Sequence, residues 1–398
     1  MLNRNVVSLT LAQSFAMTGP AISVLLGGIV GNTLAPSPQW ATLPVALMVI
    51  GGALTIIPAA RLMQAVGRKL AFISAAGIGV SSGLIAAYGI TSEVFAIFCL
   101  ACFLIGVNNA FVQQYRFAAA ESVPSEGASK AISFMMLGGI VAAYIGPEVA
   151  TLLVNSLGKH LYAGSFVGLS VLMIGAILSL LFYQNTLPDK LARVENLPAR
   201  KTGALVRQPL FITAVAASTV ASGMMGLIMT VTPVSMHVHS GFSVGDTATV
   251  IQSHIIAMFL PSLVSGYLVA RFGVFRMMIA GALSMAACIG FALWDSNFLN
   301  YWTALILLGV GWNFLFISGT TALTQTHRDS EKYTVQAIND TCIFGFQALT
   351  ALSAGAIMGA FGWDVVQWAC LPFILILMVG VAYTSRIKPV PITKLATK

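Results

Sequence analysis

Charged residues are scarce in this chain. Only 8% of its 398 residues are Asp, Glu, Lys or Arg, whereas 58% are hydrophobic, and the mean hydropathy is +0.89. A soluble domain carries about 25% charged and about 45–50% apolar residues. Folding in water would therefore expose large apolar surfaces, and a disordered chain would be far more polar. Both classes are excluded, which leaves a membrane protein with many crossings.

Cysteine and the usual catalytic motifs are equally scarce. Five cysteines in 398 residues exclude a disulfide-stabilised scaffold. The sequence holds no Gly-x-x-x-x-Gly-Lys-Ser/Thr phosphate loop, no His-Glu-x-x-His zinc pair and no Gly-x-Ser-x-Gly nucleophile elbow. Its basic residues form no patch interleaved with aromatics, as nucleic-acid binding would require. We therefore expect no enzyme, no catalytic residue, no cofactor, no metal and no nucleic-acid partner.

Long apolar runs fill most of the chain. A helix crosses a bilayer with about 20 apolar residues and satisfies its own backbone there. The alternating pattern of a membrane β-barrel is absent. The runs predict an all-α membrane protein with twelve transmembrane helices. They fall near residues 6–31, 41–60, 70–91, 94–117, 131–155, 163–184, 210–236, 247–270, 276–294, 301–323, 335–360 and 364–385.

The basic residues are distributed unevenly between the loops. Twelve crossings place both termini on one side, and nineteen of the 20 Lys and Arg residues then fall on that side, with Lys159 on the other. Positive residues concentrate in the cytoplasmic loops of membrane proteins. The pattern predicts that both termini are cytoplasmic. The net charge of +8 also favours contact with anionic lipid headgroups.

The chain divides into two halves that repeat one loop. The longest polar stretch, residues 184–208, separates six predicted helices from six. The loop after the second helix reads ARLMQAVGRK and the loop after the eighth reads GYLVARFGVF, with Gly67 and Gly273 206 residues apart. Parallel duplicated halves are a known transporter architecture, with the solute site between them near mid-membrane. We expect an N-terminal six-helix half at 1–185, a cytoplasmic linker at 186–209 and a C-terminal six-helix half at 210–398.

Both loops resemble the signature of the major facilitator superfamily, Gly-x-Leu-x-Asp-Arg-x-Gly-Arg-Arg/Lys. The signature residues kept in the two copies are Leu62, Gly67, Arg68 and Lys69, then Gly266, Leu268, Arg271 and Gly273. Gln64 and Ala270 replace the family's aspartate, which puts its charge-based lock in question, and Glu121 resembles the acidic partner of such locks. The resemblance implies a monomeric secondary transporter that works by alternating access. Its implied gating residues are Gly67, Arg68, Lys69, Glu121 and Gly273.

Two longer stretches narrow the resemblance. Residues 108–121 (NNAFVQQYRFAAAE) and 311–340 are similar to a proteobacterial branch of the superfamily, near which some riboflavin importers fall. This similarity implies a bacterial inner-membrane protein that moves a small organic solute, with uptake of a vitamin such as riboflavin as one possibility. Gly146-Pro147 partly resembles the family's antiporter motif, which suggests export of a drug or metabolite instead. A non-transporting receptor or scaffold on the same fold is the third possibility.

The resemblance implies that the first, fourth, seventh and tenth helices line the solute cavity. Buried amides in a membrane are costly unless paired, so such residues either bind solute or join helices. The amide, Trp and Met content suits a neutral, partly aromatic solute. The candidate substrate-binding residues are Gln13, Thr18, Asn108, Asn109, Gln113, Met225, Trp312 and Asn313.

Ionisable residues inside the predicted helices are candidates for proton coupling. They are Glu148, His254 and Asp340. A buried carboxyl or imidazole can exchange a proton near neutral pH, but each also has a structural interpretation: water contact for Glu148, core packing for His254 and a helix-start contact for Asp340. Arg116 is expected to reach the membrane surface or pair with Glu121, with contact to a substrate anion as the alternative.

Overall fold

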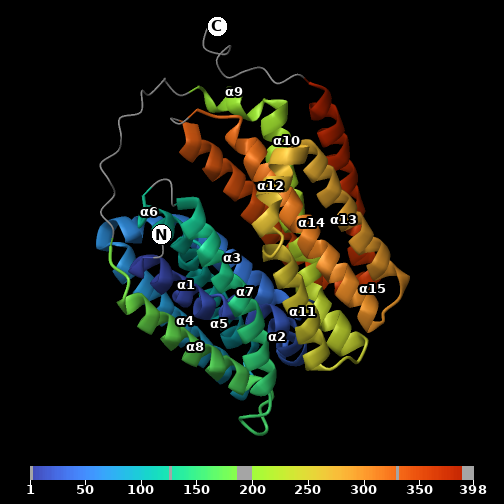
Figure 1. Cartoon of the computed structure of the whole chain (residues 1–398). Helices are drawn as coiled ribbons and strands as arrows, with labels where there is room; N and C mark the ends of the chain where they lie inside the picture. Colours follow the sequence, from blue (N-terminus) through green and yellow to red (C-terminus); the bar gives the residue numbers. More distant parts are fainter. Residues whose placement is uncertain (1–2, 125–127, 186–199, 329–330, 388–398) are drawn as a thin grey trace.

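The computed structural model describes residues 3–124, 128–185, 200–328 and 331–387, and helices make up nearly all of them (Figure 1). The helices of the first half are α1 (Arg4–Ala16), α2 (Thr18–Leu34), α3 (Leu43–Val66), α4 (Arg68–Thr91), α5 (Phe95–Val112), α6 (Tyr115–Glu121), α7 (Ala128–Leu152) and α8 (Ala163–Leu181). Those that follow are α9 (Thr202–Val206), α10 (Pro209–Pro233), α11 (Val244–Phe259), α12 (Ser262–Phe272), α13 (Val274–Trp294), α14 (Phe298–Thr324) and α15 (Lys332–Arg386). Most of the predicted linker at 186–209 lies outside the described residues.

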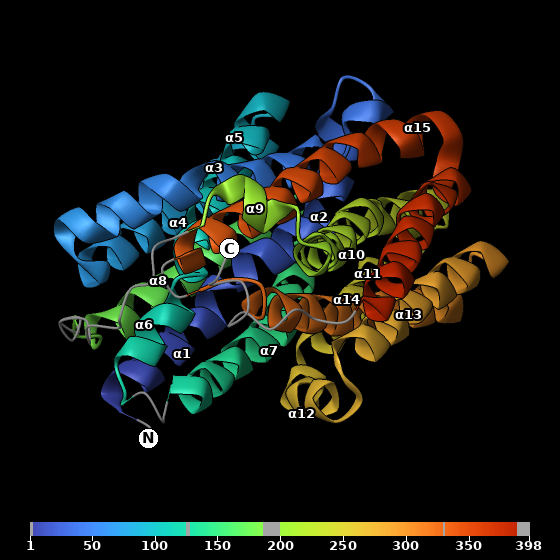
Figure 2. The same ribbon diagram turned by 90° about the horizontal axis from the view of Figure 1, so that it is seen from above.

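The spans are consistent with the twelve predicted segments. Nine helices in the described part of the chain are long and apolar enough to cross a membrane, or ten if α11 and α12 form one bent span. One of the nine is α15, whose 55 residues break at Gly362 (φ 81°, ψ −177°), a conformation that a side chain would strain. Figure 2 shows α15 doubling back, so it accounts for two predicted segments. The 25-residue α7 matches the remaining segment.

Three spans depart from a regular helix at one point along their length. Met17 interrupts the first span between α1 and α2, and Gln113 and Gln114 interrupt the fourth between α5 and α6. The α11–α12 pair bends by 43° just before Pro261, which has no backbone N–H to donate. Backbone groups freed at such breaks are tolerated in a membrane where they face protein or a cavity.

The helices gather into two groups, which we call the N-terminal bundle (α1–α8) and the C-terminal bundle (α10–α15) (Figure 1). Small residues let the helices within a bundle approach closely. A Cβ added to Gly106 of α5 would lie 1.9 Å from the Met48 carbonyl oxygen of α3, and one on Gly51 would lie 2.3 Å from that of Phe103. The backbones of α3 and α5 are therefore in direct contact.

The two bundles contact each other at the end of the molecule away from α6 and α9, which we call the closed end (Figure 1). There, Gln252 of α11 donates hydrogen bonds to the Tyr144 carbonyl and the Glu148 carboxylate of α7, both at 3.2 Å. The Tyr162 hydroxyl lies 3.4 Å from His237 Nε2. These polar contacts, together with apolar packing, join the bundles at this end.

Two glycines let side chains of one bundle approach the backbone of the other at the closed end. A Cβ on Gly355 of α15 would lie 2.2 Å from Thr42 Oγ1, and one on Gly28 of α2 would lie 2.7 Å from the Val234 side chain. At both positions a side chain larger than hydrogen would collide with a side chain of the other bundle.

Candidate functional site

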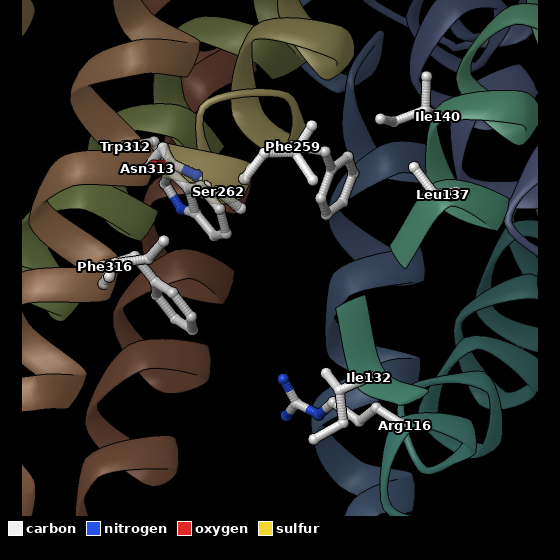
Figure 3. Close-up of a pocket in the computed structure, with 11 residues that line it drawn as sticks. Arg116, Ile132, Leu137, Ile140, Phe259, Ser262, Trp312, Asn313 and Phe316 are labelled. Carbon is white, nitrogen blue, oxygen red and sulfur yellow. Dashed lines mark hydrogen bonds between the residues drawn. The ribbon is translucent and has the colours of Figure 1, made fainter. Parts of the chain in front are cut away.

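A cavity of about 230 Å³ lies between the two bundles (Figure 3). It extends from the level of the α11–α12 bend toward α6, so it lies on the side away from the closed end. Apolar side chains make up most of its wall. The lining residues are Arg116, Ile132, Leu137 and Ile140 of the N-terminal bundle and Phe259, Ser262, Leu263, Trp312, Asn313, Phe316 and Ile317 of the C-terminal bundle.

Trp312 and Phe316 form an aromatic wall on α14. They are four residues apart and so share one face of the helix. Their rings stack with centroids 4.7 Å apart and planes only 11° apart. The indole Nε1 of Trp312 donates to Ser222 Oγ of α10 at 3.3 Å, which fixes the ring. The pair gives the cavity a flat, oriented apolar surface, as Figure 3 shows.

Asn313 also lines the cavity, but its amide serves the C-terminal bundle. Its Nδ2 donates to the Met258 carbonyl at 2.7 Å and to Ser262 Oγ at 2.6 Å, and its Oδ1 accepts from Ser265 Oγ at 2.6 Å. The side chain is fully buried. Both amide hydrogens are used, so Asn313 holds α14 to the α11–α12 bend.

Arg116 is the cavity's charged residue on the side of the N-terminal bundle. Its guanidinium points into the cavity, toward the opposite wall that carries Phe316 (Figure 3). The expected pairing with Glu121 is wrong, because Glu121 accepts instead from Arg68 Nη2 at 2.8 Å. Arg116 Nε is buried without a hydrogen-bond partner, and the guanidinium packs over the Phe117 ring at 4.8 Å.

The other predicted substrate-binding residues are not among those that line this cavity. Asn108 is buried between helices of the N-terminal bundle, where Nδ2 contacts Met173 Sδ at 3.7 Å. The Thr18 hydroxyl donates to the Phe15 carbonyl at 2.5 Å. Gln13 is buried, and Asn109, Gln113 and Met225 are half-buried. The structure therefore brings Trp312 and Asn313 together at the cavity and leaves these six elsewhere.

The proton-coupling candidates lie in three separate places. Glu148 is exposed at the closed end, where Gln252 donates to it. His254 is fully buried, with Nδ1 2.8 Å from the Leu305 carbonyl; because a carbonyl only accepts, Nδ1 carries the proton, and Nε2 has no hydrogen-bond partner. Asp340 is half-buried on α15, accepts from Asn339 at 3.2 Å and interacts electrostatically with Arg116.

The predicted gating residues lie at the end of the molecule that carries α6. Gly67 ends α3 with φ 82°, and Gly273 ends α12 with φ 85°, so the repeated glycines adopt the same left-handed conformation that favours glycine. Arg68 forms the ion pair with Glu121, and Lys69 Nζ donates to the Leu181 carbonyl at 2.7 Å. Both contacts lie within the N-terminal bundle.

A second ion pair fixes the start of α15. Arg200 donates to the Glu331 carboxylate from its backbone N–H, Nε and Nη2, at 2.7 to 2.9 Å. The Glu331 side chain is only 1% exposed. Hydrogen bonds from the Arg200 side chain are the main cause that lowers the pKa of Glu331 to about 2. Sequence reasoning missed this pair, because the two residues are 131 positions apart.

Two bundles of membrane-spanning helices around a central cavity define the class of a membrane transporter. The sequence profile of the Major Facilitator Superfamily matches residues 6–342 and, in an overlapping match, residues 224–398. The chain belongs to this superfamily. It is a multi-pass membrane transporter and not an enzyme.

Two relatives match nearly the whole chain. The riboflavin transporter RfnT of Brucella anthropi is 36% identical over 386 residues, which cover 97% of this chain and 96% of that protein. The uncharacterised MFS-type transporter YdeG of Bacillus subtilis is 28% identical over 381 residues, covering 90% of this chain and 86% of that protein.

Solved structures share the fold at low sequence identity. A bacterial homologue of the human lysosomal transporter Spinster, in an inward-facing and unoccupied conformation, superposes with a TM-score of 0.71 at 14% identity, covering 96% of both chains. The human organic anion transporter MFSD10 gives a TM-score of 0.67 at 12% identity, covering 95% of this chain and 99% of that one.

Proposed function

We propose that this chain imports riboflavin, or a closely similar flat aromatic solute, by alternating access. The observation that carries the proposal is the aromatic wall of Trp312 and Phe316 in a cavity between the bundles. The 36% identity to a riboflavin transporter across the whole chain supports the same solute.

The cavity suits the chemistry of riboflavin. Its ring system is planar, aromatic and uncharged, and such rings gain about 0.5–1.5 kcal/mol from stacking on an aromatic side chain beyond the burial of their area. The remaining wall is largely apolar, with Arg116 as a strong hydrogen-bond donor. A small highly charged solute would find little of the polar coordination that it needs.

The arrangement of the bundles supports alternating access. They touch at the closed end, whereas the cavity lies toward the end that carries α6. The distribution of basic residues supports a cytoplasmic location for that end. The conformation is then inward-facing. We take the protein to be a monomer in the bacterial inner membrane. Glu148, His254 and Asp340 remain the candidates for proton coupling. The matching conformations of Gly67 and Gly273 support two repeated halves on either side of the linker.

Riboflavin binding is best tested at Trp312 with the detergent-purified protein. Flavins absorb where tryptophan emits, so riboflavin bound at the aromatic wall quenches intrinsic fluorescence. We expect saturable quenching, and we expect Trp312→Ala to weaken binding about tenfold, since stacking and ring burial are lost.

The matched control is Trp302→Ala on the same helix. Trp302 is half-buried outside the cavity and donates from Nε1 to Ser253 Oγ at 2.8 Å. Its replacement should leave the dissociation constant unchanged. Equal weakening in both variants would contradict a stacking role for Trp312.

Export of lipophilic compounds is the second candidate function, favoured by Gly146-Pro147 of α7. This motif packs tightly on α2, since a Cβ on Gly146 would lie 3.1 Å from Ala21 Cβ and 3.3 Å from Thr18 Cα. Quenching or thermal stabilisation by many unrelated lipophilic drugs, with none by riboflavin, would favour export.

A further inference from the structure

The polar side chains in the cavity wall offer hydrogen-bond donors rather than acceptors. Among the described lining residues, those with polar side-chain atoms are Arg116, Ser262, Trp312 and Asn313, and none is Asp or Glu. The Trp312 N–H and both Asn313 amide hydrogens are already donated within the C-terminal bundle. The Ser262 hydroxyl accepts from Asn313, and its own proton has no acceptor in the described part of the chain. The donors left for a solute are therefore those of Arg116 and Ser262.

Arg116 is the stronger of these two free donors. Its Nε is buried without a hydrogen-bond partner, and its guanidinium forms no ion pair within 4.0 Å among the described residues. The group that it packs on is the Phe117 ring. A buried charged donor without an acceptor costs free energy, so a solute group that accepts from it would bind strongly there.

Arg116 and the aromatic wall lie on opposite sides of one cavity. Figure 3 shows the guanidinium directed from α6 into the open space, with Trp312 and Phe316 of α14 across it. A flat solute stacked on the wall therefore turns an edge toward Arg116. The planar fork of a guanidinium is suited to acceptor oxygens on such an edge. In riboflavin, one end of the ring system carries two carbonyl groups.

We propose that Arg116 determines the specificity of the cavity by donating to a ring carbonyl of a flat solute whose face lies on Trp312 and Phe316. The inference rests on the proposed function and adds the solute group that this site recognises. Because Arg116 is positively charged and no described lining residue is a carboxylate, the site also disfavours lipophilic cations. The solute class is a carbonyl-bearing aromatic ring without positive charge.

The test weakens the ring carbonyls one at a time. Riboflavin, 2-thioriboflavin and 4-thioriboflavin have nearly the same shape, but sulfur accepts hydrogen bonds more weakly than oxygen. Isothermal titration calorimetry of the detergent-purified protein gives the dissociation constants. We expect Arg116→Met to bind riboflavin about 10- to 100-fold more weakly than wild type, because a charge-assisted hydrogen bond is lost. At least one thio form should bind the wild type about tenfold more weakly than riboflavin, and this difference should vanish in Arg116→Met.

Arg61→Met is the matched control, since Arg61 is an exposed arginine of the same bundle that does not line the cavity. It should bind all three flavins as the wild type does. The melting temperature of the ligand-free protein separates binding from structure. Because Arg116 Nε has no partner, Arg116→Met should unfold at or above the wild-type temperature, whereas saturating riboflavin should stabilise the wild type more than the variant.

Two further ligands test the group that is recognised. Lumiflavin lacks the ribityl chain but keeps both ring carbonyls, so Arg116→Met should weaken its binding by the same factor as that of riboflavin. Tetraphenylphosphonium is a lipophilic cation and should not displace riboflavin from the wild type.

The outcomes separate two failures. If riboflavin binds the wild type but both thio forms bind it equally well, the carbonyl contact is overturned while the proposed function stands. A loss in Arg116→Met that occurs with riboflavin and not with lumiflavin also overturns it, because Arg116 would then contact the ribityl chain. If riboflavin itself does not bind, the proposed function fails and this inference fails with it. If Arg116→Met does not fold, the wild-type comparison of the three flavins still decides the question.

Discussion

Neighbouring residues on α14 have opposite tasks. The ring of Trp312 lines the cavity, whereas both amide hydrogens of Asn313 are donated to the Met258 carbonyl and Ser262 Oγ at the α11–α12 bend. In a soluble helix the apolar face marks the core, but in a membrane helix every face is apolar, so periodicity does not reveal which face lines a cavity. The sequence could therefore indicate that both residues are buried at mid-helix and could not divide their roles.

The same limit explains Asn108 and Arg116. Asn108 is a candidate substrate-binding residue from the sequence, yet its side-chain amide contacts Met173 inside the N-terminal bundle. For Arg116 the sequence leaves three positions open: the membrane surface, a pairing with Glu121, or contact with a solute anion. The structure places it in the wall of the cavity, on α6 after the interruption at Gln113 and Gln114. The segment after this interruption packs on α7 and α1 of the same bundle, and the sequence of one helix does not show which neighbours it will meet.

The ion pair of Arg200 with Glu331 makes folding stability depend on pH. Because the pKa of Glu331 is lowered from 4.5 to about 2, the unfolded chain binds its proton more readily, so the pair stabilises the fold fully above pH 4.5 and loses this effect as the pH falls toward 2. The contribution is on the order of 3 kcal/mol.

We expect Glu331→Gln to lower the melting temperature at pH 7, and the difference from wild type to shrink as the pH is lowered from 5 to 3. Scanning calorimetry or dye-based thermal unfolding in detergent measures both. Glu93→Gln, at an exposed carboxylate, serves as the control and should have little effect. A difference that stays constant with pH would mean that the ion pair does not carry the stabilisation.

At the scale of helices, the length of the apolar runs predicts the spans well. Each of the twelve segments corresponds to one helix, to a broken pair or to one arm of α15. The interruption at Met17 has a cause in the sequence, because Pro20 has no backbone N–H to donate to the carbonyl four residues before it. Nothing in the sequence marks the Gln113-Gln114 interruption. Gly362 is different, because its positive φ is one that favours glycine.

The close contact of α3 with α5 gives a prediction at this scale. Gly106→Ala should lower the melting temperature clearly, because the new Cβ would lie 1.9 Å from the Met48 carbonyl oxygen and would push two backbones apart. Gly290→Ala is the matched control on α13, where a Cβ meets nothing within 4 Å and alanine favours the helix. Thermal unfolding of both variants tests the contact; equal melting temperatures would refute it.

At the scale of the molecule, the closed end must open if the bundles alternate. Thr42 and Gly355 face each other across it, with 3.3 Å between Thr42 Cβ and the Cβ position of Gly355, close to the spacing in disulfides. We expect the double variant Thr42→Cys, Gly355→Cys, made with Cys342→Ser, to lose transport on oxidation and to regain it with a reductant. The other four cysteines are buried.

Each single cysteine variant should be insensitive to the oxidant, which separates locking from damage. If the oxidised double variant forms the disulfide and still transports at the wild-type rate, the closed end does not need to open, and alternating access through the cavity is wrong.

Transport of riboflavin into proteoliposomes that contain only this protein tests the central claim most directly. We predict saturable uptake of labelled riboflavin, exchange with unlabelled riboflavin loaded inside, and strongly reduced uptake with Trp312→Ala but not with Trp302→Ala. Binding without flux would instead support a receptor or scaffold on a transporter fold. No riboflavin flux, with flux of another solute through the same vesicles, would contradict the proposed substrate.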